Sequence, residues 1–531
     1  MLGWHVRREY FQPELTRLTE ATRTLAPGTN FYALRMGNES VGMATSRLDT
    51  IPDRGGFVLE DQMNLELQAM GQPGGAVTRT RVRLSTALAM EEFSFTLDSD
   101  AGSFGAEGRV EGDTLLLVDV DAGGGTEEVS FRLNEPPIFA AVLPIRVALS
   151  GNLEVGRTFR FPVFDPSTVS NRTVEVEVLE QGTMVVADSA VRDPDTERWE
   201  SSGERTVSVW RVEERFGGME VESWIDEDGR VLRSSSPMGF SMEKIPFELA
   251  RQEQEDTRAR GGTAEGGGDV VLSTAIESDV DLGEVEEHEE LRFVLGGVDL
   301  EGFDLDGGRQ ELRGDTLLVR REDWSSLDPG YTLPYPRMDL RESLQSEPLI
   351  QSGDDRIVRE ARRAVGGGMS DPVEAARRLN DHVHGLISKE MAFAIPSALQ
   401  VLENRRGDCN EHTILYVALA RALGLPARTA VGLVYMEGSF FYHAWPEVWL
   451  GEWTAMDPTL GQAPAGAAHI RFRVGGLAQQ VEIARLIGRL EIQALDGPVA
   501  SHPNAGPGSP AEVGWSGARS GTGDRVREGR R

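Results

Sequence analysis

Residues 405–413 read RRGDCNEHT, and the chain then continues through the apolar run ILYVALARAL to Gly424. Because aspartate caps helices well, Asp408 and this apolar run predict a buried helix that begins at Cys409 and ends near Gly424. A thiol in the first turn lies at the positive end of the helix dipole, which favours thiolate. The neighbouring Asp408 carboxylate opposes that effect. A nucleophilic Cys409 therefore needs an imidazolium partner from elsewhere in the fold.

Strands are expected downstream of this helix, and one of them, residues 440–450, carries His443. The next strand follows Gly451 and runs to Asp457-Pro458. Adjacent antiparallel strands bring side chains next to each other, so His443 and Asp457 can become neighbours. A turn near Gly451 leaves Asp457 a few residues away from direct register with His443. The spacing therefore permits a contact between them but does not require it.

Four motifs in this order resemble the transglutaminase-like superfamily: GDC at 407–409, GLPAR at 424–428, HAWPEV at 443–448 and WTAMDPT at 453–459. The resemblance implies a papain-like α+β fold, in which a cysteine begins a helix packed on an antiparallel sheet that carries histidine and aspartate. It implies Cys409 as the nucleophile, His443 as the general base and Asp457 as the acidic member of a triad. Trp445 and Trp453 match aromatic residues that pack around such a site.

The chemistry implied by the resemblance is acyl transfer. The thiolate attacks an amide carbonyl, an amine or ammonia leaves, and water or a second amine then takes the acyl group from the thioester. The expected substrate is a protein or peptide with a peptide or isopeptide amide, and hydrolysis is favoured over amine transfer. The Cys409 backbone N–H would supply one oxyanion donor. The alternative is a non-catalytic binding or assembly module that keeps the fold.

The three triad candidates also have ordinary structural explanations. A lone thiol is more often a small buried apolar group than a nucleophile. His443 could be a core histidine bonded to a backbone carbonyl, and an aspartate that precedes proline, as Asp457 does, is commonly a turn residue. His412 lies one turn after Cys409 and either supports the site or packs and caps the helix.

Metal sites find little support in the sequence. Cys409 is the only cysteine, which excludes an intramolecular disulfide and a multi-cysteine metal site. His382 and His384 are two residues apart on a predicted helix, so they point to different faces. An acidic run lacks the spaced oxygen ligands of a calcium loop and is typical of a solvated face; it contains Asp279, Asp281, Glu284, Glu286 and Glu287. We therefore predict no metal and no other cofactor.

Length and periodicity predict a multidomain α+β protein whose N-terminal part is antiparallel and β-rich and whose C-terminal part is the papain-like core. In the N-terminal part we find no cluster of catalytic residues, so binding or scaffolding is expected there. The expected divisions are a helical segment at 1–29, two antiparallel β subdomains in 30–249, a flexible linker at 250–269, a small β-rich unit at 270–350, the catalytic domain at 351–496 and a disordered tail at 497–531.

Charge and hydropathy narrow the range of partners. The 531 residues include 86 acidic and 54 basic side chains, a net charge of -32, so a nucleic acid would be repelled over most of the surface.

Residues 1–18 are too charged for a signal peptide, which favours a cytoplasmic location for the sequence as it stands. Trp4, followed by Arg7 and Arg8, would also suit the end of an anchor helix that starts upstream. Such an anchor would place the domains outside the inner membrane.

Overall fold

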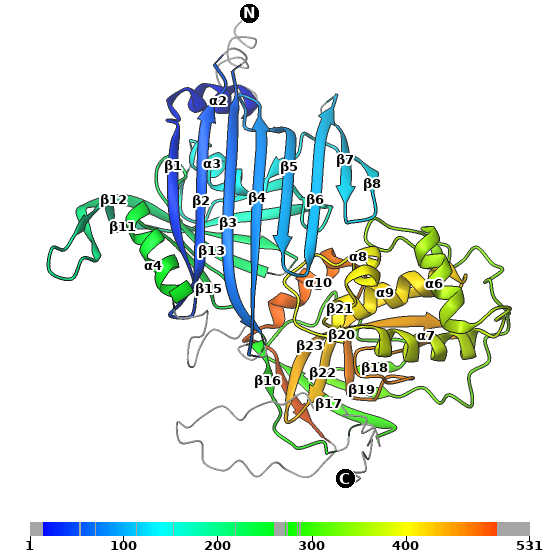
Figure 1. Cartoon of the computed structure of the whole chain (residues 1–531). Coiled ribbons are helices and arrows are strands. Elements are labelled where there is room, and N and C mark those ends of the chain that lie inside the picture. Colours follow the sequence, from blue (N-terminus) through cyan, green and yellow to red (C-terminus); the bar gives the residue numbers. More distant parts are fainter. Residues whose placement is uncertain are drawn as a thin grey trace, which may run out of the picture. The chain divides into compact units, whose positions relative to one another are not determined.

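The computed structural model describes residues 14–495 except 53–54, 70, 113, 152, 218, 260–270, 272–273, 284 and 286–287. Within these residues the chain is β-rich, with a large N-terminal sheet (Figure 1). The expected disordered tail and the charged beginning of the chain lie outside the described residues. No helix in the described part is both long enough and apolar enough to span a lipid bilayer.

The described part of the chain starts with a short helix, α2, and then enters an antiparallel meander in which each strand pairs with the next, as Figure 1 shows. Alternating burial along these strands gives the sheet one apolar face, as the period-two sequence pattern predicts. The elements are α2 (Glu14–Ala21), η1 (Thr22–Thr24), β1 (Gly28–Met36), β2 (Glu39–Thr50), β3 (Phe57–Ala69), β4 (Gln72–Leu84), β5 (Met90–Ser99), β6 (Gly102–Glu111), β7 (Leu115–Asp121) and β8 (Thr126–Arg132).

A second meander continues the same sheet. Its last strand, β15, pairs with β1, so fifteen strands form one hydrogen-bonded path in the order β8 to β1 followed by β15 to β9. The elements are β9 (Ile138–Phe139), η2 (Ala140–Val142), α3 (Leu143–Ala148), β10 (Thr158–Asp165), β11 (Ser170–Arg192), β12 (Trp199–Phe216), β13 (Met219–Ile225), β14 (Val231–Ser235) and β15 (Phe240–Lys244).

The two meanders are not separate subdomains, which corrects the division expected within residues 30–249. They share one apolar core, in which the Phe164 ring of the second meander lies 5.2 Å from Phe93 and 5.6 Å from Phe131 of the first. A meander with one apolar face has to cover that face, and here each covers the other.

The predicted linker at 250–269 is also wrong over its first ten residues. They belong to the helix α4 (Phe247–Ala259), which packs on β1, β2 and β12. Polar contacts with the sheet hold this helix: Glu253 pairs with Arg35 at 2.7 Å, and Gln252 accepts a hydrogen bond from the Trp199 N–H at 2.8 Å. The low apolar content of this segment predicted a linker. Composition could not reveal the helix, because the residues that hold it in place, Arg35 and Trp199, lie far away in sequence. Residues 260–269 are outside the described part.

The C-terminal half contains a five-stranded and a four-stranded sheet. The first has the order β16-β23-β22-β25 with β24 on β23, and the second has the order β18-β19-β17-β26. Their strands are β16 (Ile276–Glu277), β17 (Glu290–Gly296), β18 (Gln310–Arg313), β19 (Thr316–Arg320), β22 (Ala427–Met436), β23 (Ser439–Trp449), β24 (Trp453–Ala455), β25 (His469–Val474) and β26 (Glu491–Ala494).

Residues 270–350 do not form a unit of their own, contrary to the expectation. Strand β16 belongs to the five-stranded sheet, and β17 pairs with β26 near the C-terminal end of the described chain. Phe293 of β17 packs edge-on against Phe440 of β23 at 5.7 Å, so both sheets enclose one core. The strands of residues 270–350 thus help to support the sheet that carries His443.

The predicted helices are confirmed. The Asp354 and Asp371 side chains cap α6 and α7 as the sequence indicates, and Gly366 ends α6 with a positive φ. Helices α6, α7, α8 and α9 share an apolar core with β22 and β23. The helices and the short strand pair beside them are η4 (Glu342–Leu344), α6 (Asp355–Val365), α7 (Pro372–Leu386), β20 (Ser388–Lys389), α8 (Ala398–Asn404), β21 (Arg406–Gly407), α9 (Cys409–Ala422), α10 (Leu477–Ile483) and η5 (Ala484–Leu486).

Candidate active site

Cys409 is the first residue of α9, as predicted. The Asp408 side chain accepts a hydrogen bond from the Asn410 N–H at 2.8 Å, and the Glu411 side chain accepts one from the Asp408 N–H, also at 2.8 Å. This capping box fixes the start of the helix. Gly407 has a φ of 155°, and a Cβ there would lie 2.3 Å from the Glu411 side chain, so only glycine fits immediately before the cap.

Cys409, His443 and Asp457 lie in one continuous contact. The Cys409 thiol lies close enough to the His443 side chain for each group to shift the pKa of the other. On the other side of the ring, His443 Nε2 lies 2.8 Å from Asp457 Oδ2. His443 and Asp457 are buried, whereas Cys409 is half-buried. The structure therefore brings together the three residues that the sequence analysis selected.

Asp457 reaches His443 through a turn rather than through strand register. Strand β24 ends at Ala455, and the Asp457 and Gln462 main chains then form an isolated bridge. Asp457 Oδ1 accepts hydrogen bonds from the Thr459 N–H at 2.8 Å and the Leu460 N–H at 2.9 Å. Asp457 is thus a turn residue and a partner of His443 at once, and the two explanations offered for it are compatible.

His469 is a further member of the cluster that the sequence analysis missed. It begins β25, which pairs with β22 beside the strand that carries His443. Its Nε2 lies 2.8 Å from Asp457 Oδ2, and its buried Nδ1 has no hydrogen-bond partner in the described part of the chain. The available signal was weak: a histidine at the start of an apolar strand shortly after Asp457.

These three residues are also the set that could hold a metal ion. One ligand atom each from His443, Asp457 and His469 lies within 4.8 Å of the others, and all three residues are buried. Both histidine Nε2 atoms already face the Asp457 carboxylate at hydrogen-bond distance. A metal ion would have to displace these protons and would take His443 away from Cys409.

The comparison with known families agrees with this geometry. Residues 359–458, which include Cys409, His443 and Asp457, match the family model of the transglutaminase-like superfamily. This region is a transglutaminase-like domain. No curated protein matches the chain.

Solved structures show only distant similarity. A predicted cysteine protease from Cytophaga hutchinsonii is 15% identical, with 42% of this chain and 90% of that chain covered and a TM-score of 0.27. A β-barrel-like protein from Brucella abortus is 14% identical over 42% of this chain and 97% of its own, with a TM-score of 0.31. The periplasmic domain of TgpA from Pseudomonas aeruginosa is 21% identical over 34% and 75%, with a TM-score of 0.22. These scores are too low to support an argument, so the assignment rests on residues 359–458.

Two tryptophans of the transglutaminase-like region take different positions. Trp445 is buried, stacks on His443 at a ring distance of 6.0 Å, and meets His469 edge-on at 5.2 Å. Trp453 packs instead against Trp449 at 5.5 Å and under the Arg428 guanidinium at 4.0 Å. Trp445 thus orients the histidines directly, whereas Trp453 braces the β23–β24 turn.

Charge and burial set the protonation of the cluster. Burial alone would raise the pKa of Asp457, but the two histidines hold that pKa well below its usual range. Burial lowers the pKa of His443, yet the Asp457 carboxylate and Cys409 outweigh it and raise that pKa to about 10. Burial and the Asp408 carboxylate raise the pKa of the Cys409 thiol, which the neighbouring His443 only partly offsets. The Asp457 carboxylate thus favours the imidazolium form of His443, whereas burial and Asp408 favour the thiol form of Cys409.

The other histidines have structural partners. His412 Nδ1 bonds the Asp408 carbonyl at 2.7 Å, and burial lowers its pKa to about 4, so it acts as a neutral part of the helix cap. His382 bonds Glu360 and His384 bonds the Pro458 carbonyl, which confirms that these two point to different faces. The second contact ties α7 to the turn that carries Asp457.

The described acidic residues of the run considered for calcium, Asp279 and Asp281, are also engaged in local contacts. Asp279 accepts a hydrogen bond from the Ala494 N–H, and Asp281 accepts one from the Gly283 N–H and one from the Tyr435 hydroxyl. The glutamates at 284, 286 and 287 are outside the described residues.

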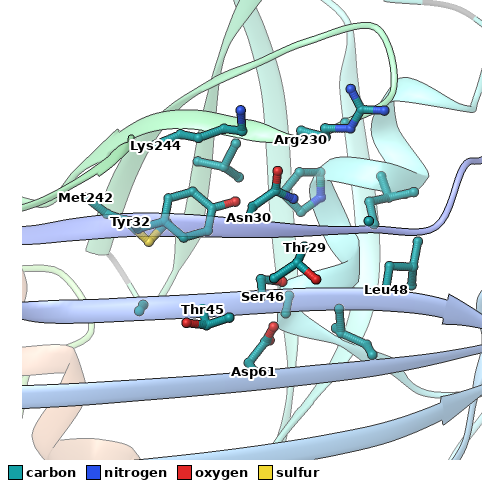
Figure 2. A pocket seen from close by; sticks show the side chains of 18 of the residues that line it. Thr29, Asn30, Tyr32, Thr45, Ser46, Leu48, Asp61, Arg230, Met242 and Lys244 are labelled. Atoms are coloured by element: carbon teal, nitrogen blue, oxygen red, sulfur yellow. The ribbon is translucent and has the colours of Figure 1, made fainter. Parts of the chain in front are cut away.

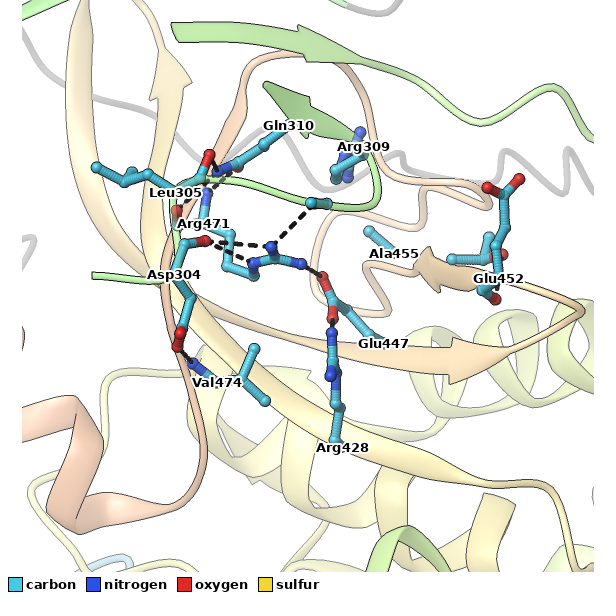
Figure 3. A network of polar contacts seen from close by, with 12 residues as sticks. Asp304, Leu305, Arg309, Gln310, Arg428, Glu447, Glu452, Ala455, Arg471 and Val474 are labelled. Atoms are coloured by element: carbon cyan, nitrogen blue, oxygen red, sulfur yellow. Dashed lines mark hydrogen bonds and ion pairs between the residues drawn. The ribbon is translucent and has the colours of Figure 1, made fainter. Parts of the chain in front are cut away.

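A buried ionic network fixes the strand that carries His443 (Figure 3). Glu447 of β23 pairs with Arg428 of β22 at 2.6 Å and with Arg471 of β25 at 3.1 Å. The Arg471 guanidinium also donates to the carbonyls of Asp304 and Gly307 at 3.1 Å. Burial alone would raise the pKa of Glu447, but the two arginines outweigh burial and bring that pKa below its usual value. The carboxylate therefore stays ionised. Three strands and a loop are therefore fastened at one point.

Replacement of Glu447 by glutamine should lower the free energy of unfolding by about 3 kcal/mol, because removing one partner leaves a buried arginine unpaired. Urea denaturation of the purified chain measures this. Glu374→Gln, which breaks exposed pairs on α7, is the control and should lower the free energy of unfolding far less. Equal effects for the two variants would show that the Glu447 network does not stabilise the domain.

Replacement of Asp408 by asparagine should make the thiol more reactive at pH 7. The change removes a negative charge beside Cys409, which lowers its pKa, and asparagine retains the helix cap. Alkylation by iodoacetamide should accelerate by roughly three- to tenfold, since thiolate is the reacting form. Cys409 is the only thiol, so the label has one destination. The exposed Asp381→Asn on α7 is the control, and an unchanged rate in Asp408→Asn would contradict the assigned role of Asp408.

Proposed function

We propose that the transglutaminase-like region is a cysteine enzyme that acts on peptide or isopeptide amides through a thioester on Cys409. The observation that carries this proposal is the unbroken contact from the Cys409 thiol through the His443 ring to the Asp457 carboxylate. An acyl-transfer site needs a nucleophile, a proton carrier and a group that orients the carrier, and these residues supply the three in that order.

In the first half-reaction, the Cys409 thiolate, whose proton has passed to solvent because His443 is already protonated, attacks the amide carbonyl carbon and a tetrahedral oxyanion forms. The N–H of Cys409 lies in the first turn of α9, where backbone donors lack partners within the helix, so it can stabilise this oxyanion. His443, already protonated, gives its proton to the amide nitrogen. The C–N bond then breaks, the amine leaves, and a thioester remains on Cys409.

In the second half-reaction, His443 has lost its proton and acts as a base. It takes a proton from water or from a second amine, which attacks the thioester carbonyl as the C–S bond breaks. The product is a carboxylate with water or a new amide with an amine. We favour water as the acceptor, by analogy with the breadth of the superfamily. Asp457 and His469 keep the His443 ring in one orientation throughout.

The pH dependence follows from the raised pKa of the thiol. At pH 7 the proton needed by the leaving amine is present on His443, but the thiolate is scarce. As the pH rises, the thiolate fraction increases while His443 keeps its proton up to about pH 10. The value of kcat/KM should therefore rise from neutral into the alkaline range and fall again when His443 deprotonates.

Cys409→Ala and His443→Ala test the proposal. Both should abolish amide turnover, because the nucleophile or the proton carrier is gone, and Cys409→Ala should leave the melting temperature nearly unchanged. The wild type and both variants are incubated with a library of glutamine- and lysine-containing peptides, and mass spectrometry scores cleavage, deamidation and cross-linking. His382→Ala is the matched histidine control, since His382 bonds Glu360 on α6.

The products separate the two acceptor reactions, because cleavage or deamidation identifies water and cross-links identify an amine. Turnover retained in Cys409→Ala would refute the mechanism. Turnover absent from all four proteins over the alkaline range would leave the binding or assembly module as the better account of this region.

A further inference from the structure

A cavity of about 620 Å³ lies among the strands of the N-terminal sheet (Figure 2), and none of the candidate active-site residues lines it. Its walls are the inward faces of strands from both meanders, together with α3. Buried residues such as Leu59 form its interior, whereas Asp188 and Arg205 at its margin are exposed. Sheets that cover one another normally fill the space between them with side chains, so a cavity here is unusual. Its volume is large enough to hold a small organic molecule.

Two carboxyl groups in the cavity wall lack a counterion. Glu214 of β12 and Asp61 of β3 have no basic side chain within ion-pair distance among the described residues. Glu214 has no hydrogen-bond partner in that same part of the chain, and Asp61 is held only by Ser46, with its Oδ1 unpaired. Burial raises the pKa of Asp61 to about 6 and that of Glu214 to about 7. Unpaired carboxyl groups in such a place need an explanation.

The basic residues of the cavity wall face other carboxylates, and none of them lies within ion-pair distance of Glu214 or Asp61. Asp188 pairs with Arg205 and lies 4.0 Å from Lys244. Arg230 pairs with Asp228 at 2.7 Å. The wall carries four carboxyl groups, Asp61, Asp188, Glu214 and Asp228, against three cations, so its charge is net negative when all four are ionised, and this favours a cationic guest.

The rest of the wall suits an apolar body. Leu48, Met63 and Met242 line the cavity, and Met side chains adapt to guests of different shape. Tyr32 lies among them and its hydroxyl offers a polar contact within reach of the same space (Figure 2). The site therefore combines a place for a positive charge with an apolar surface.

We propose that this cavity binds an amphipathic organic amine, with its ammonium group at one of the two unpaired carboxyls, Glu214 or Asp61, and its apolar part against Leu48, Met63 and Met242. Such a guest supplies the counterion that the protein lacks and fills the apolar remainder of the space. Simple alcohols and carboxylates with the same apolar chain lack the positive charge and should bind more weakly.

Three probes with the same eight-carbon chain test the charge preference: octylamine, 1-octanol and octanoate. Each is titrated calorimetrically into the full-length Cys409→Ala chain, in which covalent chemistry at the candidate active site is impossible. Octylamine should bind at least about tenfold more tightly than either of the others, since only it carries a positive charge that can pair with a carboxylate of the wall. Equal binding of octanol, or tighter binding of octanoate at the basic residues of the wall, would overturn the proposal.

Variants locate the bound amine. Glu214→Gln should remove most of the preference for octylamine. Asp61→Asn, a separate variant that also keeps the size of the side chain, should weaken the same preference. Glu213→Gln is the matched control, because Glu213 is the neighbouring residue of β12, lies on the other face of the sheet and pairs with Arg215 at 2.5 Å. Undiminished octylamine binding in both cavity variants would place the amine elsewhere and refute the assignment. This outcome does not depend on whether Cys409 is catalytic.

Discussion

The geometry of the site depends on one carboxylate. Asp457 is fully buried, and its two oxygens accept hydrogen bonds from the Thr459 and Leu460 main chains and from the Nε2 atoms of His443 and His469. Burial of an ionised carboxylate is tolerated only with such partners. The same contacts hold the His443 ring so that its remaining nitrogen meets Cys409, and they explain why its proton is retained at neutral pH. The Glu447 network then fixes the strand on which His443 stands.

Local sequence signals predicted the elements that carry the site. The start of α9 at Cys409, the caps at Asp354 and Asp371 and the strand around His443 all follow from side chains that act within a few residues, and the structure has them. From the sequence, the strand spacing allowed a contact between His443 and Asp457 but did not predict it. It is made because the chain leaves the strand after Ala455 and turns, which period-two counting does not foresee.

Long-range pairing accounts for most of what the sequence did not reveal. The pairing of β1 with β15 joins segments about two hundred residues apart, so one sheet was predicted as two subdomains. The pairing of β17 with β26 spans a similar distance, so a sheet that supports the catalytic region was predicted as a separate unit. Likewise, α4 is stabilised by Arg35 and Trp199, which a composition argument cannot connect with it. His469 was missed for the same reason, because only the β22–β25 pairing brings it to Asp457.

The most direct test of this account is the titration of His443, followed by NMR in the full chain with ¹⁵N-labelled histidine and assigned by comparison with His443→Ala. The account predicts that His443 keeps both ring protons through neutral pH and loses one only near pH 10, because the Asp457 carboxylate stabilises the imidazolium. In Asp457→Asn the same ring should titrate at a much lower pH. A wild-type His443 that titrates near pH 6.5, as an ordinary histidine does, would contradict the claim that Asp457 governs the site.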